Sequence, residues 1–175
     1  MRFSTVISVL ACGAMAFAAA LAPGVLVGRS STGVSDAVSV LNHKCDSILP
    51  LFDTCNDAQC TDTIVLKLVA EVDVATAACV NLNEGISAPL VQGVAGVVSK
   101  IILKLNSHKL SCGGKCGDFS VYAKIDLCIS LWLQQLGVCV SGILVSVAAL
   151  LLDVVLVLQG LSLSLILKVC LFIQV

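Results

Sequence analysis

The sequence predicts an all-α fold, a helical bundle cross-linked by disulfides. Four successive segments between Val34 and Cys139 carry apolar residues at helical spacing, and Pro, Gly and Asn separate them. The chain of 175 residues also holds ten cysteines. Its composition is 58% hydrophobic and 12% charged, whereas soluble domains are about 25% charged. This composition excludes disorder, because disordered chains contain few apolar residues.

The N-terminus predicts secretion. Arg2 precedes an uncharged apolar run that reaches Leu21, and Ala20-Leu21-Ala22 places small residues where signal peptidase cleaves. We therefore expect a signal peptide over residues 1–22 and a protein that is secreted or held at the cell surface. The alternative is an uncleaved anchor helix. Residues 23–33 are expected to form a flexible linker, and residues 34–175 the helical bundle domain.

Cleavage would leave 10 − 1 = 9 cysteines, because Cys12 belongs to the signal peptide. Cysteines in an oxidising compartment normally pair. Eight can form four bridges, and the sequence alone does not assign the connectivity. Cys170, the nearest to the C-terminus, is the candidate for the unpaired residue. The candidates for bridges are Cys45, Cys55, Cys60, Cys79, Cys112, Cys116, Cys128 and Cys139.

The first two helices flank an acidic loop at residues 53–62. Pro50 is expected to end the first helix, because the residue before proline avoids the helical region. Thr61 is expected to be the N-cap of the second helix. Asn83-Glu84-Gly85 is expected to end that helix. The stripe of the first is Val34, Val38, Leu41, Cys45 and Ile48. The stripe of the second is Ile64, Leu68, Val72, Ala75, Cys79 and Leu82.

The next two helices flank a glycine-rich loop, Ser111–Asp118. Ser87 is expected to cap the third helix, where Pro89 is tolerated in the first turn, and residues 106–108 are expected to end it. Its stripe is Leu90, Val94, Val97, Ile101 and Leu105. The stripe of the fourth helix is Val121, Ile125, Cys128, Trp132, Leu136 and Cys139.

The C-terminal tail predicts a helical hairpin that is broken near Gly160. Residues 127–175 contain only two charges, Asp153 and Lys168. The alternation of leucines over residues 161–175 also fits a strand by period. The helical character of the preceding segments favours a helix.

The cysteine spacing indicates a weak internal duplication. Cys-Val occurs at Cys79 and at Cys139, each time after a pair of cysteines and before a segment that ends at a further cysteine. The repeat predicts two helical hairpins packed face to face, with halves at 34–111 and 112–175. The alternative is coincidence among nine cysteines.

The sequence gives little support for catalysis, metal binding or nucleic-acid binding. The net charge of −1 supplies no cationic excess for phosphates. The spacing of His108, Cys112 and Cys116 could ligate zinc, but secretion favours disulfides. The acidic loop at 53–62 lacks the ligand spacing of an EF-hand. Because no catalytic motif is present, we predict a non-enzymatic protein without catalytic, cofactor-binding or metal-binding residues.

The tail is more apolar than a helical pair needs for its core, and this predicts a contact surface. The expected partner is a hydrophobic interface, a lipid or a cell-wall component. Two alternatives remain: a membrane-spanning helix near 136–158 and a helical pocket that carries lipid. A second copy of the chain is a further candidate partner. The uncharged run from Leu127 to Leu152 is long enough to span about 30 Å.

The opening Met1-Arg-Phe-Ser-Thr-Val6 and the segment Cys45-Asp-Ser-Ile-Leu-Pro50 look like those of small secreted proteins of basidiomycete fungi. The chain is also loosely similar to the hydrophobic-surface-binding secreted proteins of fungi, which are helical and of similar length. This resemblance implies secretion and an apolar contact surface, and it assigns no site residues. Hydrophobins differ, because they carry adjacent Cys-Cys pairs.

Overall fold

The structure is a computed structural model that describes residues 33–112 and 119–171. The described residues belong to one compact unit. The predicted signal peptide (1–22), the predicted linker apart from Gly33, and Cys116 lie outside the described residues.

The described residues are helical and contain no strand, which confirms the all-α fold. Residues 164–171 are helical too, so the alternative of a strand there was wrong. The elements in chain order are α2 (Val34–Ile48), η1 (Leu49–Thr54), α3 (Ala58–Cys79), α4 (Ala88–Cys112), α5 (Phe119–Cys139), α6 (Ile143–Leu150), η2 (Leu152–Val154), α7 (Val155–Gly160) and α8 (Ser164–Leu171).

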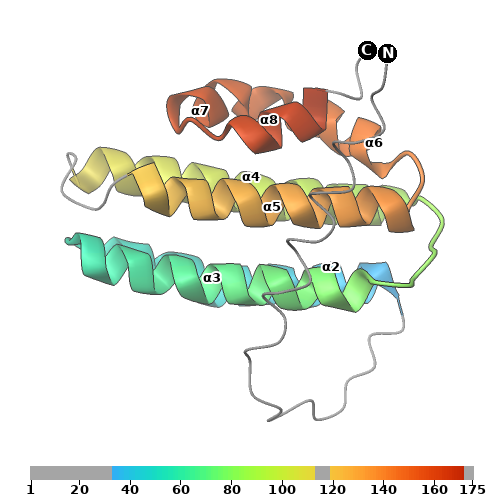
Figure 1. Cartoon of the computed structure of the whole chain (residues 1–175), viewed down its shortest axis with the longest axis horizontal. Coiled ribbons are helices and arrows are strands. Elements are labelled where there is room, and N and C mark those ends of the chain that lie inside the picture. The colour runs from blue at the N-terminus through green and yellow to red at the C-terminus, as the bar shows by residue number, and fades with distance from the viewer. Residues whose placement is uncertain (1–32, 113–118, 172–175) are drawn as a thin grey trace, which may run out of the picture. The chain divides into compact units, whose positions relative to one another are not determined.

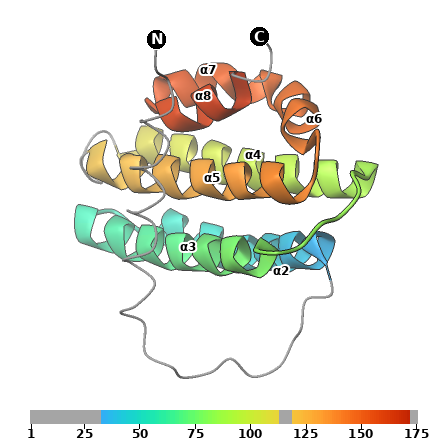
Figure 2. The ribbon, with the colours of Figure 1, turned by 45° about the vertical axis from the view of Figure 1, so that its right-hand side comes forward.

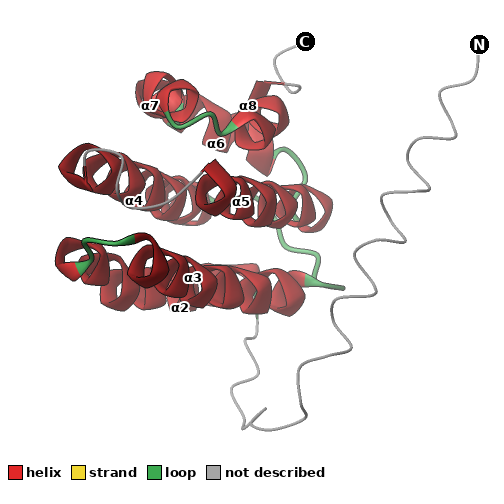
Figure 3. Cartoon of the chain, turned by 60° about the vertical axis from the view of Figure 1, so that its left-hand side comes forward, coloured by secondary structure: helices red, strands yellow, loops and turns green. Residues whose placement is uncertain are grey.

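The helices form three antiparallel hairpins stacked as layers (Figure 1). The first hairpin is α2–η1 with α3, the second is α4 with α5, and the third is α6–η2–α7 with α8. The second hairpin lies between the other two, and the turned views in Figure 2 and Figure 3 show the same order of layers. Each helix pair is joined by a short connection, which makes antiparallel neighbours the favoured arrangement.

In the first two hairpins, α2 runs parallel to α4, and α3 runs parallel to α5. The Lys100 ammonium of α4 lies 2.7 Å from a carboxylate oxygen of Asp46 in α2, and the Lys104 ammonium lies 2.6 Å from Asp53 one turn further along. Lys124 near the start of α5 pairs with Asp62 near the start of α3. The two hairpins are therefore stacked with α2–η1 on α4 and with α3 on α5.

The third hairpin continues this stacking on the other side of the second. The Lys109 ammonium, near the end of α4, donates a hydrogen bond to the Gly160 carbonyl oxygen at the end of α7, over 2.8 Å. Asp126 of α5 accepts hydrogen bonds from the start of α8. The duplication predicted halves at 34–111 and 112–175. The helices form three hairpins, and a division after residue 111 falls inside the second.

The second hairpin is buried on both of its broad faces. In α4 the adjacent pairs Val97–Val98 and Ile101–Ile102 are all fully buried. Adjacent residues of a helix point about 100° apart, so their joint burial requires neighbours on two sides. In α5 Trp132 is the largest fully buried side chain, and its indole N–H has no hydrogen-bond partner among the described residues. The predicted stripes of both helices are buried.

Two helix boundaries in the first hairpin differ from the prediction. Pro50 does not end the helical path, because the chain tightens after Ile48 into the 3₁₀ helix η1, with Pro50 in its first turn. The N-cap of α3 is Asp57, whose carboxylate accepts a hydrogen bond from the Cys60 amide over 2.8 Å. Thr61 was therefore wrongly predicted as the cap. It lies in the first turn, is buried, and donates to the Asp57 carbonyl.

The other helix ends show one confirmation and two differences. Ser87 caps α4 as predicted, and its hydroxyl accepts a hydrogen bond from the Leu90 amide over 3.4 Å. However, α4 does not end at 106–108 but continues to Cys112. His108 contributes to its buried face, which explains the continuation. α3 ends at Cys79, so Leu82 lies in the connection to α4 rather than on the helix.

The start of α2 is held by a side chain from a distant part of the sequence. Glu84, in the connection between α3 and α4, accepts hydrogen bonds from the Val34 amide and the Ser35 hydroxyl, each over 2.6 Å. The pKa of the Glu84 carboxyl is lowered, chiefly by the bond from the Ser35 hydroxyl. A Cβ atom at Gly33 would lie 2.9 Å from the Glu84 carboxylate, so glycine leaves the room that this cap needs.

Candidate functional site

The outer surface of the third hairpin carries the strongest candidate for a contact site. Inward-facing residues recur through α6, η2 and α7 at intervals of four, four, three and four: they are Ile143, Val147, Leu151, Val154 and Leu158, all buried. Outward-facing residues recur at intervals of four, three and four: they are Val145, Ala149, Leu152 and Leu156, all exposed. We call this second set the outer stripe.

Exposure along the outer stripe is high for side chains of this kind. Val145 is 50% exposed, Leu152 57% and Leu156 79%. Leu150, beside the stripe, is 50% exposed. Single exposed leucines are common on protein surfaces, but a continuous apolar row is a mark of an interaction site.

The surroundings of the outer stripe are almost uncharged. Residues 143–171 contain one acidic and one basic residue, Asp153 and Lys168. Residues 34–79 of the first hairpin contain nine such residues. The outer stripe therefore lies on the hairpin with the fewest charges to hydrate.

A buried carboxylate fastens the third hairpin to the second. The Asp126 side chain is 5% exposed and accepts hydrogen bonds from the Leu165 and Ile166 amides, each over 2.8 Å. It satisfies two of the amides that the start of α8 leaves without a helical partner. The sequence interpretation missed Asp126, because a carboxylate that caps a helix 39 residues away leaves no local pattern.

The predicted disulfide candidates fall into two groups. Cys55 and Cys60 form a disulfide across the turn between η1 and α3. Cys112, at the end of α4, is also disulfide-bonded, and Cys116 lies outside the described residues. The remaining candidates carry free thiols within the core: they are Cys45, Cys79, Cys128 and Cys139. Cys170, the predicted unpaired residue, carries a free thiol as well.

Burial raises the pKa of four of the free thiols. Desolvation is the main cause that raises the pKa of Cys45, Cys79 and Cys170 to about 11 and that of Cys128 to about 12. The thiolate is the nucleophile and metal ligand of cysteine, so these residues are not poised for catalysis in the folded protein.

Cys79 and Cys139 lie together at the ends of α3 and α5. The Cys139 sulfur lies 2.8 Å from the Cys79 carbonyl oxygen and accepts a hydrogen bond from the side-chain Nε2 of Gln135 over 3.3 Å. The Glu84 amide donates to the Cys139 carbonyl oxygen over 3.1 Å. The structure thus brings together the two Cys-Val positions of the duplication.

His108 is buried, and its ring lies against Thr61, Phe52 and the Cys112 sulfur, which is 3.6 Å from Nε2. Its Nε2 atom is 3.0 Å from the Thr61 hydroxyl, and its ring centroid is 5.0 Å from that of Phe52. Desolvation lowers the pKa of His108, which favours the neutral imidazole. The described residues contain no cluster of three or more His, Cys, Asp or Glu that could hold a metal ion. His108 therefore packs as a core residue here.

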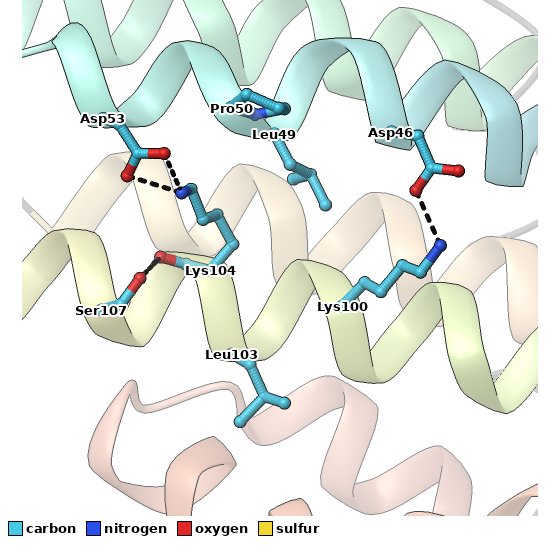
Figure 4. A pocket seen from close by; sticks show the side chains of 8 residues that line it. All are labelled: Asp46, Leu49, Pro50, Asp53, Lys100, Leu103, Lys104 and Ser107. Atoms are coloured by element: carbon cyan, nitrogen blue, oxygen red, sulfur yellow. Dashed lines mark hydrogen bonds and ion pairs between the residues drawn. The ribbon is translucent and has the colours of Figure 1, made fainter.

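A surface groove of about 460 Å³ lies between α2–η1 and α4 (Figure 4). Its polar side chains are already engaged with one another, since Lys100 pairs with Asp46 and Lys104 with Asp53. Figure 4 shows Leu103 pointing away from both pairs. A second hollow of about 330 Å³ surrounds the Glu84 cap. Charged or polar side chains line both hollows, beside Leu49, Pro50 and Leu103 in the first and Leu82 in the second.

Among the described helices, α4 is by itself long and apolar enough to cross a membrane, and half of its apolar 18-residue stretch is buried within the protein. The span expected near 136–158 is divided, because α5 ends at Cys139 and Gly142 takes a left-handed conformation before α6. α6 and η2–α7 meet the same criteria only as a pair bent by 53°.

Comparisons with known proteins give no family assignment: the chain matches no protein-family model, no curated protein and no solved structure.

Proposed function

We propose that this protein is a secreted, non-enzymatic protein that adsorbs to uncharged apolar surfaces through the outer stripe of its third hairpin. The single observation that carries the proposal is the outer stripe itself, an exposed apolar row through α6, η2 and α7. The signal-peptide pattern of residues 1–22 supports action outside the cell.

The chemistry of the partner follows from the charges near the stripe. Asp153 and Lys168 are the only charged residues in the sequence 143–171, so attraction to an ionic surface contributes little. Burial of apolar area contributes roughly 25 cal/mol per Å² removed from water. A lipid acyl layer, a hydrophobic solid or an air–water boundary offers this chemistry, and we choose a zwitterionic lipid surface as the probe.

The test compares two double variants that add the same charge at opposite ends of the stack. Leu152→Lys with Leu156→Lys places two ammonium groups on the outer stripe. The matched control, Val40→Lys with Val74→Lys, places them on the first hairpin, where these valines are 45% and 63% exposed. Binding is measured as partitioning into phosphatidylcholine vesicles and as surface pressure at an air–water boundary.

The wild-type protein is expected to partition into the vesicles with little dependence on salt. The outer-stripe variant should bind roughly tenfold more weakly or worse, because it loses the burial of two leucine side chains. The control should bind like the wild type. Equal losses in both variants, or no adsorption of the wild type, would contradict the proposal. Adsorption replaced by concentration-dependent dimers in sedimentation would identify self-association instead.

A further inference from the structure

The ends of α3 and α5 place two buried thiols against each other. We propose that Cys79 and Cys139 form a disulfide in the mature protein and that this bond fastens the first hairpin to the second. The inference concerns how the stack is held together. It rests on the secretion in the proposed function, but not on what the outer stripe contacts.

Proximity is the first argument. The Cys139 sulfur lies 2.8 Å from the backbone oxygen of Cys79, and disulfides join residues whose backbones are close neighbours. The parallel course of α3 and α5 brings both C-terminal ends to the same side of the stack (Figure 1). The bond from the Glu84 amide to the Cys139 carbonyl holds the same two segments together from the connection that follows α3.

The hydrogen bonding around the pair tolerates loss of the thiol protons. The Cys79 carbonyl oxygen also accepts a bond from the Leu82 amide over 3.2 Å, so it keeps a partner when the Cys139 thiol no longer donates. The side-chain Nε2 of Gln135 donates to the Cys139 sulfur, which remains a weak acceptor in a disulfide. Oxidation therefore leaves no buried carbonyl at this site without a donor.

The bond would form by thiol–disulfide exchange with a disulfide compound of the oxidising compartment. One cysteine thiolate attacks the compound and releases one thiolate, which leaves a mixed disulfide. The second cysteine thiolate attacks the mixed disulfide and releases the other. In total two protein thiols and one disulfide compound give one protein disulfide and two small thiols, so the protein loses two hydrogens and the compound gains them.

Burial sets when this exchange takes place. In the folded protein, desolvation raises the pKa of the Cys79 thiol to about 11, which leaves little thiolate for attack. The exchange is therefore expected while the chain folds, before α3 and α5 close over the pair. Once formed, the bond is protected from reductants because both cysteines are buried.

A count of free thiols tests the pairing directly. The full chain is purified from the medium of a secreting host, unfolded without reductant and titrated with a thiol reagent. With the disulfide present, Cys79→Ala and Cys139→Ala should each raise the count by one, because each variant releases the partner thiol. The double variant should give the wild-type count. A decrease of one in each single variant would overturn the proposal.

Peptide mapping of the wild-type protein needs no variant and so does not depend on whether a variant folds. Trypsin cleaves after Lys67, Lys100 and Lys124, and chymotrypsin after Trp132, which separates Cys128 from Cys139. The expected product is a peptide containing Cys79 linked to one containing Cys139. Recovery of both as unlinked alkylated peptides, or linked to other cysteines, would overturn the proposal, whereas the vesicle experiment tests the outer stripe separately.

Discussion

The first and third hairpins cover opposite faces of the second, yet they differ in their content of charged side chains. Residues 34–79 carry nine charged side chains and residues 143–171 carry two. Among the residues that the structure describes, three ion pairs join the first hairpin to the second, at Lys100, Lys104 and Lys124. The described contacts of the third hairpin with the second are apolar, apart from the Asp126 cap and the bond from Lys109.

The two outer hairpins thus give the two ends of the stack different surfaces. Stacked helical units need a polar outer face on each terminal unit to remain soluble. The first hairpin carries the larger share of the charged side chains, nine against two in the third. The third hairpin departs from it along the outer stripe, and a departure from a general rule is where a function is expected.

The largest effect should come from the cap that holds the third hairpin. Asp126→Ala removes a buried carboxylate from two amides at the start of α8 and is expected to cost about 3 kcal/mol in the free energy of unfolding. Asp126→Asn, which keeps one acceptor, should cost less. Urea unfolding measures both, with the exposed Asp153→Ala as control. A cost for Asp126→Ala no larger than for Asp153→Ala would show that the cap does not secure this layer.

The corresponding cap of the first hairpin should have a smaller effect that depends on pH. Glu84→Gln removes the charge that accepts bonds from Val34 and Ser35, and we expect a cost of about 1 kcal/mol near neutral pH. Because folding lowers the pKa of Glu84, the charge stabilises the fold above the unfolded pKa.

That contribution should disappear as the pH falls through the folded pKa. The unfolded pKa is about 4.3, so the wild type and Glu84→Gln should converge in unfolding free energy at acidic pH below it. Urea unfolding at several pH values measures the difference. A gap between the two proteins that stays constant down to about pH 2 would rule out the charged cap.

An ion pair between the first and second hairpins should contribute less. Lys104→Met keeps the stem of the side chain and removes the charge that pairs with Asp53. The expected cost is about 0.5 kcal/mol, because exposed pairs contribute little and salt screens them. Unfolding in low and in high salt measures it. A cost that does not fall with salt would point to packing rather than charge.

The smallest effect on stability is expected from the outer stripe. Leu152→Lys with Leu156→Lys should change the free energy of unfolding by less than about 0.5 kcal/mol, because these side chains already face solvent. Thermal unfolding measures the change. A large loss would show that the stripe is packed in solution and is no free surface.

Periodicity predicted the helices well where each buries one face. The stripes from Val34 to Ile48 and from Val121 to Cys139 are buried as expected, because their spacing reports burial directly. Helix ends were less predictable. Asp57 and Thr61 are both good N-caps, and only the Asp57 bond to the Cys60 amide, beside the Cys55–Cys60 disulfide, decides between them.

The candidate site was predictable only in part. Surplus apolar residues after residue 127 indicated an apolar surface, but not which residues form it. That choice depends on the register against the second hairpin, which buries Val154 and Leu158 and leaves Leu152 and Leu156 outside. The caps at Glu84 and Asp126 join residues 50 and 39 positions apart, and no local pattern reveals such pairs.

Hydrogen exchange of the protein adsorbed on phosphatidylcholine vesicles tests the central claim most directly. Amides over residues 143–160 should exchange more slowly in the adsorbed protein than in solution, whereas those of α2 and α3 should be unchanged. Slower exchange confined to α2 and α3, or a pattern identical to that in solution, would contradict the claim that the third hairpin is the contact surface.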